Sequence, residues 1–382
     1  MNRKFWVIIL LPLVLLSGCW DVDEPERMLY IHGMGVDYKD GKYEVYAQII
    51  SFANTAKSEM PPSDLPQAEV GYETGETIDE AIHNLYHSMD EKVYWGHLSY
   101  LVVSEEVLKN TKLSPIIDTF IRFRETRYKI WVYATKDSVE EVLLVKPVLN
   151  KTVSLSKLSD PENSFKQESY VEPIDIRRLI IDMNEPGYEA KIPVVTLIDN
   201  WKSSKETINS ISVNGVAVVT PKGLQGEILD DKARGLQWMS NDTKRGQLTF
   251  KLSNGEYISA IIEKVNRKIK PVLGTGDARF DINVNMTVYV SVIVGEVSYQ
   301  EIRKHVIEEA EKEIMKTYEE ALKKDIDIYG FSNVLYRENV KVWKEQHTDG
   351  KINLTESSIR NITIQLDKIA SDRKSIKPTI EE

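Results

Sequence analysis

The stretch "INVNMTVYVSVIV", residues 282–294, carries the clearest secondary-structure signal in the chain. Successive side chains of a β-strand point to opposite faces, so a strand with one buried face alternates apolar and polar residues. The apolar positions of this stretch are Ile282, Val284, Met286, Val288, Val290, Val292 and Val294. We therefore expect a long, half-buried strand here.

A helix is predicted directly after this strand. Ser298 and Glu301 have the spacing of a capping box, in which a hydroxyl and a carboxylate satisfy free amide donors at a helix start. The apolar face of the helix comprises Ile302, Val306, Ala310, Ile314 and Ala321. The opposite face is heavily charged, and we interpret it as a solvated surface because the apolar spacing is not the sustained heptad of a coiled coil. A second helix is expected over residues 331–344 and a final strand over residues 360–369.

The N-terminal part of the chain mixes hairpins with alternating strands and helices. Asp40-Gly41 is a two-residue turn signal and predicts a hairpin over residues 29–51. Thr77 and Glu80 form another capping box at the start of a helix. Because hairpins occur together with strand–helix alternation, we expect an α+β protein with mainly antiparallel or mixed sheets.

The pattern of elements predicts three mixed α/β domains after an N-terminal signal peptide. The signal peptide is assigned to residues 1–18 and an N-terminal domain to residues 19–198. A small middle domain is expected over residues 199–270 and a C-terminal domain over residues 271–382. The polar stretch 199–210 is expected to be a linker between the first two domains.

Composition excludes some classes of partner. The chain has 382 residues, a formal net charge of -10 and 42% hydrophobic residues, so it can bury sizeable cores. An acidic chain lacks the positive footprint of a nucleic-acid-binding protein. For the same reason bulk charge does not hold it to anionic lipid.

The N-terminus has the layout of a secretory signal. Arg3 and Lys4 precede the apolar segment 5–16, and small residues then lead to Cys19. The apolar segment is shorter than the roughly 20 residues that a spanning helix needs. No later stretch approaches that length, so we expect no transmembrane helix in the mature protein.

Residues 16–19, "LSGC", match the bacterial lipobox. The signal is then cleaved between Gly18 and Cys19, and Cys19 receives an S-diacylglyceryl group and an N-acyl group. Cys19 is the only cysteine, so a disulfide framework is excluded. The alternative is an ordinary signal peptide with an incidental cysteine. If Cys19 is lipidated, Trp20, Asp21 and Glu24 form either a protein contact or a membrane-proximal stalk. Residues just after a lipid are confined near the interface, where tryptophan is stable, so the stalk is slightly favoured.

No catalytic, cofactor or metal site is predicted. His83 and His87 lie four residues apart on the predicted helix, but Asn84 stands where a zincin requires glutamate. We interpret both histidines as exposed helix residues. The glycines at positions 274 and 276 precede a strand, which offers no helix N-terminus to a phosphate. We expect a noncatalytic protein whose ligand-binding residues, if any, the sequence leaves unknown.

Several segments resemble the Ger(x)C family, the C-subunit lipoproteins of spore germinant receptors. Cys19-Trp20-Asp21 followed by Glu24 is similar to the start of the mature family proteins. The other segments that carry the resemblance are "IHGMGVDY" (31–38), "GETIDEAIHNLY" (75–86), "YWGHLSYLVVSEE" (94–106), "FIRFRETRY" (120–128), "NGVAVV" (214–219), "GLQWM" (235–239) and "DIYGFSNVLYRENVKVW" (327–343). Their order and spacing extend the resemblance over most of the chain.

The resemblance implies a subunit of a receptor that senses nutrients in dormant spores. Such proteins stand on the outer face of the inner spore membrane, beside membrane-embedded A- and B-type subunits, and fold as three mixed α/β domains. The family implies no catalytic residues, so only the lipidated cysteine is carried over, onto Cys19. It leaves open whether this subunit contacts the germinant.

Two other classes of function remain as alternatives. A solute-binding lipoprotein that feeds a transporter would need two similar α/β lobes around a cleft, whereas this chain is predicted to have one larger and two smaller, unlike domains. A lipid-anchored enzyme, such as a hydrolase, has the least support.

Overall fold

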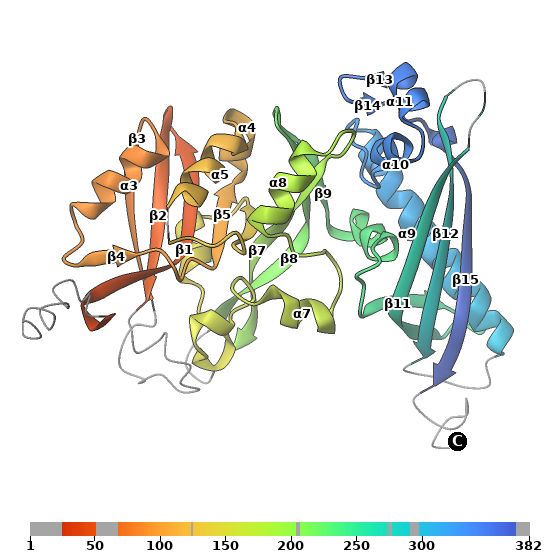
Figure 1. Ribbon diagram of the computed structural model, residues 1–382. Helices are drawn as coiled ribbons and strands as arrows, with labels where there is room; N and C mark the ends of the chain where they lie inside the picture. The colour runs from red at the N-terminus through yellow and green to blue at the C-terminus, as the bar shows by residue number, and fades with distance from the viewer. Residues whose placement is uncertain are drawn as a thin grey trace, which may run out of the picture.

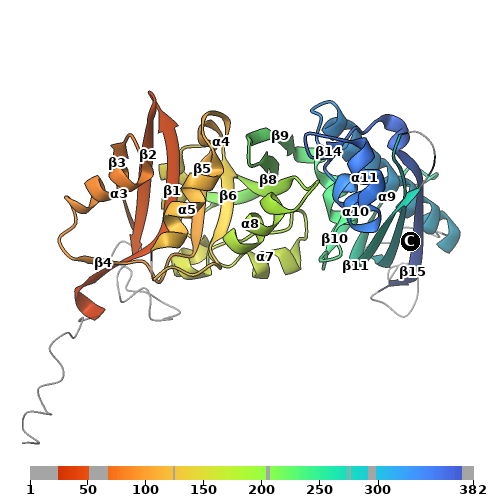
Figure 2. The same ribbon diagram turned by 45° about the horizontal axis from the view of Figure 1, so that its top comes forward.

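A computed structural model describes residues 25–50, 68–123, 125–203, 207–272, 274, 277–290 and 298–371. These residues form an α+β protein with two large β-sheets, which lie in two halves placed side by side (Figures 1 and 2). The first sheet has nine strands and the second has four, and a separate two-stranded hairpin lies outside both. The predicted fold class is confirmed.

The first sheet is mixed. Its strands are ordered β3-β2-β1-β5-β6-β7-β8-β9, with β4 also paired to β1. They are β1 (Met28–Lys39), β2 (Lys42–Ile50), β3 (Glu69–Gly75), β4 (Lys92–Tyr94), β5 (Tyr100–Ser104), β6 (Trp131–Thr135), β7 (Ala190–Lys202), β8 (Thr207–Thr220) and β9 (Gly223–Leu229). β1, β5, β6 and β7 run parallel, and antiparallel strands flank them on both sides. The predicted hairpin turn is present, because Asp40 and Gly41 both have positive φ (51° and 83°).

Helices cover both faces of the first sheet. They are α3 (Ile78–Tyr86), α4 (Glu105–Asn110), α5 (Leu113–Arg122), α6 (Val139–Leu144), α7 (Pro161–Gln167) and α8 (Ile176–Asn184). Thr77 caps α3 as predicted, since its hydroxyl accepts a hydrogen bond from the Glu80 amide at 3.1 Å. The second half of the predicted capping box differs, because the Glu80 carboxylate accepts a hydrogen bond from the Glu76 amide at 2.8 Å. α3, α4, α5 and α8 pack into one core and α6 into another on the opposite face, so all residues of β5 are buried.

The second sheet is ordered β10-β11-β12-β15. Its strands are β10 (Gly246–Lys251), β11 (Tyr257–Val272), β12 (Arg279–Val290) and β15 (Ile359–Ser371). The helices of this half are α9 (Tyr299–Leu322), α10 (Phe331–Glu338) and α11 (Val340–Gln346), and the separate hairpin is β13 (His347–Thr348) with β14 (Lys351–Ile352). Short 3-10 helices also occur: η1 (Pro25–Arg27), η2 (Val148–Asn150), η3 (Val153–Leu155), η4 (Asp230–Lys232), η5 (Arg234–Met239) and η6 (Glu356–Ser358).

The apolar face of α9 packs on the apolar face of β12. The alternate residues of β12 from Phe280 to Val290 are buried, as the alternation predicts, and positions 292 and 294 lie outside the described residues. Every predicted apolar position of α9 is buried in the same core, so α9 packs on its own sheet across one face (Figure 1). Within the part of the chain that the structure describes, no helix is long and apolar enough to cross a bilayer.

The predicted linker at residues 199–210 is wrong. β7 continues through Lys202 and β8 begins at Thr207, and Trp201 pairs with Ile208 across this hairpin. Its residues are polar because the end of the hairpin is exposed, so composition alone did not separate it from a loop. β8 and β9 extend the first sheet, whereas β10 and β11 belong to the second. The division into three domains remains a prediction about folding units, because sheet membership does not test which segments fold alone.

η5 joins the two halves. Trp238, at its C-terminal end, is fully buried in a core that contains Val216 and Val218 of β8 together with Phe280 of β12. The indole Nε1 of Trp238 donates a hydrogen bond to the Glu313 carboxylate of α9 at 2.6 Å.

The backbone of η5 approaches α9 closely. A Cβ atom at Gly235 would lie 2.5 Å from the backbone oxygen of Glu313, so only glycine allows this approach. The Gly235 amide also donates a hydrogen bond to the Thr317 hydroxyl at 3.0 Å. A close backbone contact and a buried aromatic side chain therefore fix η5 to α9.

His32 is a buried polar residue of β1. Its imidazole is 3% exposed, and its Nε2 lies 2.8 Å from the Ser159 hydroxyl. Burial lowers the pKa of His32 to about 4. His32 therefore folds as a neutral imidazole and ties β1 to the segment before α7.

Replacement of Trp238 by alanine should destabilise the protein strongly. A cavity in the core and the loss of the indole hydrogen bond to Glu313 should together lower the free energy of unfolding by about 3–5 kcal/mol. Chemical denaturation followed by circular dichroism measures this. The matched control is Trp201→Ala at a position that is 50% exposed, where we expect a loss below about 1 kcal/mol. Equal losses in the two variants would contradict the role of η5.

His32 should make the protein sensitive to mild acid. An unfolded histidine binds a proton near pH 6.5, whereas folded His32 does so only at about pH 4, so stability should be lost as the pH falls from 6.5 to 4. The loss should be on the order of 2–3 kcal/mol for this group. Denaturation of wild type and His32→Asn at pH 7 and pH 4.5 should show a smaller pH difference in the variant. His83→Asn, at an exposed position on α3, should behave like wild type.

Candidate functional site

The chain enters the folded body at the start of β1. Gly18 and Cys19, the predicted cleavage and lipidation residues, lie outside the described residues, so the lipid anchor remains a prediction. The first described residue is Pro25, whose backbone oxygen accepts a hydrogen bond from the Tyr30 hydroxyl at 2.7 Å. This contact fixes the start of the described chain next to β1.

His83 lies in the last turn of α3 and His87 lies at its C-terminal end. Both are exposed, as predicted. Their rings meet edge to face with centroids 5.4 Å apart. The described part of the chain contains no group of three or more histidine, cysteine, aspartate or glutamate side chains placed to hold a metal ion.

A hollow of about 570 Å³ lies near the entry point of the chain. We call it the proximal hollow; it is lined by residues from 145 to 158 and by the exposed end of the β7–β8 hairpin. Val153 of η3 packs in one cluster with Tyr30 and Ile50, and Tyr30 in turn binds Pro25. The proximal hollow is therefore adjacent to β1, the first strand of the described chain.

The proximal hollow exposes large apolar side chains. Leu149 is 84% exposed, and Leu155 and Trp201 are also exposed. Leu149 has a φ of 62°, which is unusual for a bulky residue and indicates local backbone strain. Lysines line the same hollow at positions 146, 151 and 157. Apolar side chains gathered in a hollow and bordered by charge are typical of a protein-binding surface.

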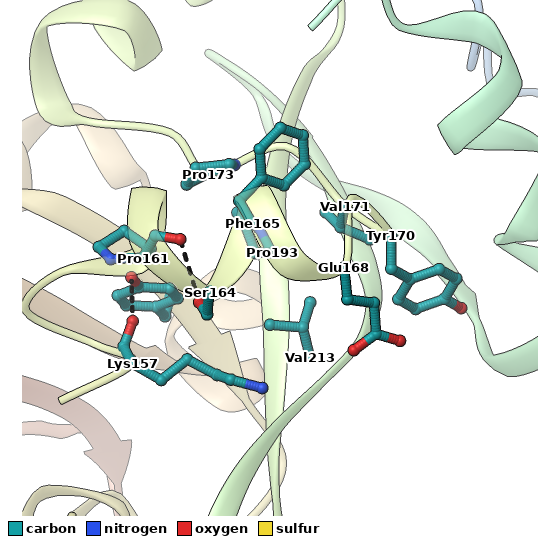
Figure 3. Close-up of a pocket in the computed structure, with 11 residues that line it drawn as sticks. Lys157, Pro161, Ser164, Phe165, Glu168, Tyr170, Val171, Pro173, Pro193 and Val213 are labelled. Atoms are coloured by element: carbon teal, nitrogen blue, oxygen red, sulfur yellow. Dashed lines mark hydrogen bonds between the residues drawn. The ribbon is translucent and has the colours of Figure 1, made fainter. Parts of the chain in front are cut away.

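A smaller pocket lies beneath α7. Figure 3 shows it between α7, which carries Ser164 and Phe165, and strands β7 and β8, which carry Pro193 and Val213. Its volume is about 40 Å³, which suffices for one or two water molecules but not for an organic ligand. The Ser164 hydroxyl in its wall donates a hydrogen bond to the Pro161 carbonyl at 3.0 Å.

A larger cavity lies where the two halves meet. We call it the junction cavity; its volume is about 300 Å³. The first half contributes residues between Phe165 and Lys191, which include α8 and the start of β7. The second half contributes residues around the end of η5, Arg267 of β11 and the start of α10.

The cations of the junction cavity differ in how they are paired. Arg178 forms an ion pair with Asp182 at 2.8 Å. Lys191 makes no ion pair within the described chain; its Nζ contacts the Tyr188 hydroxyl at 3.1 Å and lies 4.5 Å from the centre of that ring. Arg267 has a buried Nε with no hydrogen-bond partner among the described residues, and burial lowers its pKa.

The acids of the junction cavity include two that make no ion pair in the described structure. Glu172 accepts a hydrogen bond from the Ser240 hydroxyl at 3.2 Å. Desolvation and the neighbouring Asp242 raise the pKa of Glu172. Asp242 lines the same cavity from the other half of the protein.

Hydrogen bonds beside the cavity hold the halves together. Asn333 of α10 donates to the Pro186 carbonyl at 2.9 Å, and Arg337 pairs with Glu185 at 2.9 Å. The Asp327 amide donates to the Glu189 carboxylate at 2.6 Å. Burial raises the pKa of Asp327 to about 6. The cavity wall is thus built on a fixed joint.

The sequence did not reveal the junction cavity. Its charged residues stand far apart in the chain, and no motif connects Glu172, Lys191, Asp242 and Arg267. The one local signal was Lys191, a cation within the apolar strand that begins at residue 190.

Comparison with known proteins gives two family matches. A family described as "Spore germination protein N-terminal domain" matches residues 21–197, and one described as "Spore germination B3/ GerAC like, C-terminal" matches residues 214–367. Spore germination protein KC of Bacillus subtilis (strain 168) is 24% identical over 363 residues, which are 89% of this chain and 88% of that protein. Spore germination protein B3 of the same organism is 25% identical over 292 residues, 74% of this chain and 72% of that protein.

A solved structure shares the fold. The crystal structure of the GerBC protein matches with a TM-score of 0.54 and 18% identity, over 89% of this chain and 97% of that one. The two family matches together cover most of the chain, and they confirm the resemblance found in the sequence motifs. The chain belongs to the GerAC-like family of spore germination proteins.

Proposed function

We propose that this protein is a lipid-anchored, noncatalytic subunit of a nutrient germinant receptor in spores. In this proposal it stands on the outer face of the inner spore membrane and contacts membrane-embedded A- and B-type subunits. The observation that carries the proposal is the family match together with the lipobox at residues 16–19. Direct contact with the germinant is not required.

The proposed tether is short. The six residues 19–24 span at most about 20 Å, so the start of β1 must remain near the bilayer. Two or more acyl chains give stable anchoring, at about 0.8 kcal/mol per buried CH2. Confinement to the membrane raises the effective concentration of the folded body toward membrane-embedded partners, so modest contacts suffice for a complex.

The proximal hollow is the surface proposed to contact a membrane-embedded subunit. It lies beside Tyr30, which holds the entry point of the chain, and so within reach of the membrane surface. Its exposed leucines and Trp201 supply the apolar anchors of a typical interface. The acidic net charge of the chain disfavours anionic lipid as the occupant.

The alternative of a transporter-feeding, solute-binding lipoprotein has less support. It requires two similar lobes, but the described halves differ: one contains a nine-stranded mixed sheet and the other a four-stranded sheet.

Replacement of Cys19 by alanine should release the protein from membranes. Without a thiol no diacylglyceryl group can be attached, so we expect most of the protein in the soluble fraction and slower nutrient-triggered germination. Fractionation of spore membranes followed by immunoblotting measures the first effect, and loss of optical density measures the second. Glu24→Gln keeps the thiol and should behave like wild type. Full membrane retention with normal germination in Cys19→Ala would contradict the tether.

Charged substitutions in the proximal hollow should weaken the receptor complex without releasing the protein from the membrane. In Leu149→Asp/Trp201→Asp, carboxylates would be placed in a desolvated contact, so crosslinking to A- and B-type subunits should fall about tenfold or more. Quantitative mass spectrometry of the crosslinked products measures this. Tyr257→Asp changes an exposed aromatic residue on β11 and serves as the matched control. If the double variant crosslinks as well as the Tyr257→Asp control, the proximal hollow is not the contact surface.

A further inference from the structure

The junction cavity contains charges of both signs that form no ion pair with any described residue. Each half supplies one acid and one cation: Glu172 and Lys191 come from the first half, and Asp242 and Arg267 come from the second. None of these four makes an ion pair with another described residue, whereas Arg178 and Asp182 in the same wall pair at 2.8 Å.

Lys191 and Arg267 are half-buried, whereas Glu172 and Asp242 are exposed. A charged group that is partly removed from water loses hydration unless a partner of opposite charge or hydrogen bonds replace the water. The orphaned Nε of Arg267 shows that hydrogen bonding within the described protein is incomplete. The joint itself does not need these charges, because hydrogen bonds at Pro186, Glu185 and Glu189 already hold the halves. A bound molecule would supply the missing partners.

The size of the cavity limits that molecule. About 300 Å³ lies at the lower end of the range for small-molecule sites. A simple anion would be attracted by Lys191 and Arg267 but repelled by Glu172 and Asp242. A simple cation would be attracted by Glu172 and Asp242 but repelled by Lys191 and Arg267. A molecule that carries one positive and one negative group therefore fits best.

We propose that the junction cavity binds a small zwitterion that carries an ammonium group and an anionic carboxylate or phosphate group. The anionic end contacts Arg267 and Lys191, since guanidinium and ammonium groups bind both kinds of anion. The ammonium end contacts Glu172 and Asp242. Free amino acids and the phosphoethanolamine headgroup of lipids both have this chemistry.

The position of the site gives it a mechanical consequence. Each end of the ligand contacts one residue from each half, so binding should stabilise the arrangement of the two halves that this structure shows. This inference does not depend on the lipid anchor at Cys19, and its test measures binding alone.

Isothermal titration calorimetry on the full chain in detergent tests the site. The probes are the common L-amino acids and O-phosphoethanolamine, titrated separately. We expect either an amino acid or O-phosphoethanolamine to bind with one-to-one stoichiometry. Which of the two binds shows whether the site takes a free amino acid or a lipid headgroup. The N-acetyl and methyl ester forms of a bound amino acid, or the N-acetyl form of phosphoethanolamine, should bind about tenfold or more weakly because each lacks one charge.

Variants locate the site. Arg267→Met and Asp242→Asn should each weaken binding about tenfold or more. Asp242 lies at an exposed position, so its variant should fold even if Arg267→Met does not. Lys268→Met, on the neighbouring exposed residue of β11, should bind like wild type. Absence of binding by every probe, or binding that neither cavity variant weakens, would overturn the proposal.

Discussion

The packing of η5 against α9 is the interaction on which the arrangement of this chain depends. Gly235 lets the two backbones approach, and Trp238 enters a core that both sheets share. Glu313 then accepts a hydrogen bond from the indole Nε1 of Trp238 and also pairs with Arg234 at 2.7 Å. Because this joint lies between the sheets, it fixes the second half relative to the strand that leads to Cys19. The position of the junction cavity follows from the same contact.

The elements with strong local periodicity could be predicted from the sequence. In β12 and α9, the spacing of apolar residues within the element itself shows which face is buried. The side chains of Thr77 and Ser298 cap the helices that begin next to them, so the capping-box pattern marks both helix starts in the sequence. The β7–β8 hairpin end was missed because an exposed strand and a loop have the same polar composition. The placement of β1 beside β5 also lay beyond prediction, since parallel pairing depends on contacts far apart in the chain.

One candidate site could be predicted from a local sequence motif, whereas the other two depend on tertiary structure. Cys19 could be proposed from a motif because signal cleavage and lipidation act on a local, extended segment. The junction cavity depends on tertiary structure, which brings Glu172 and Lys191 to Asp242 and Arg267. The proximal hollow likewise depends on the packing of Val153 against Tyr30, which no local pattern encodes.

The proposed tether, the proposed partner surface beside it and the junction cavity together fit the proposed role of a receptor subunit that acts without catalysis. The proposed membrane attachment depends on the covalent lipid. Mass spectrometry of the N-terminal peptide from membrane-extracted protein measures it most directly. The predicted result is a peptide that begins at Cys19 and carries the added mass of a diacylglyceryl thioether and an N-acyl group. An unmodified thiol at Cys19, or a peptide that retains residues 1–18, would contradict it.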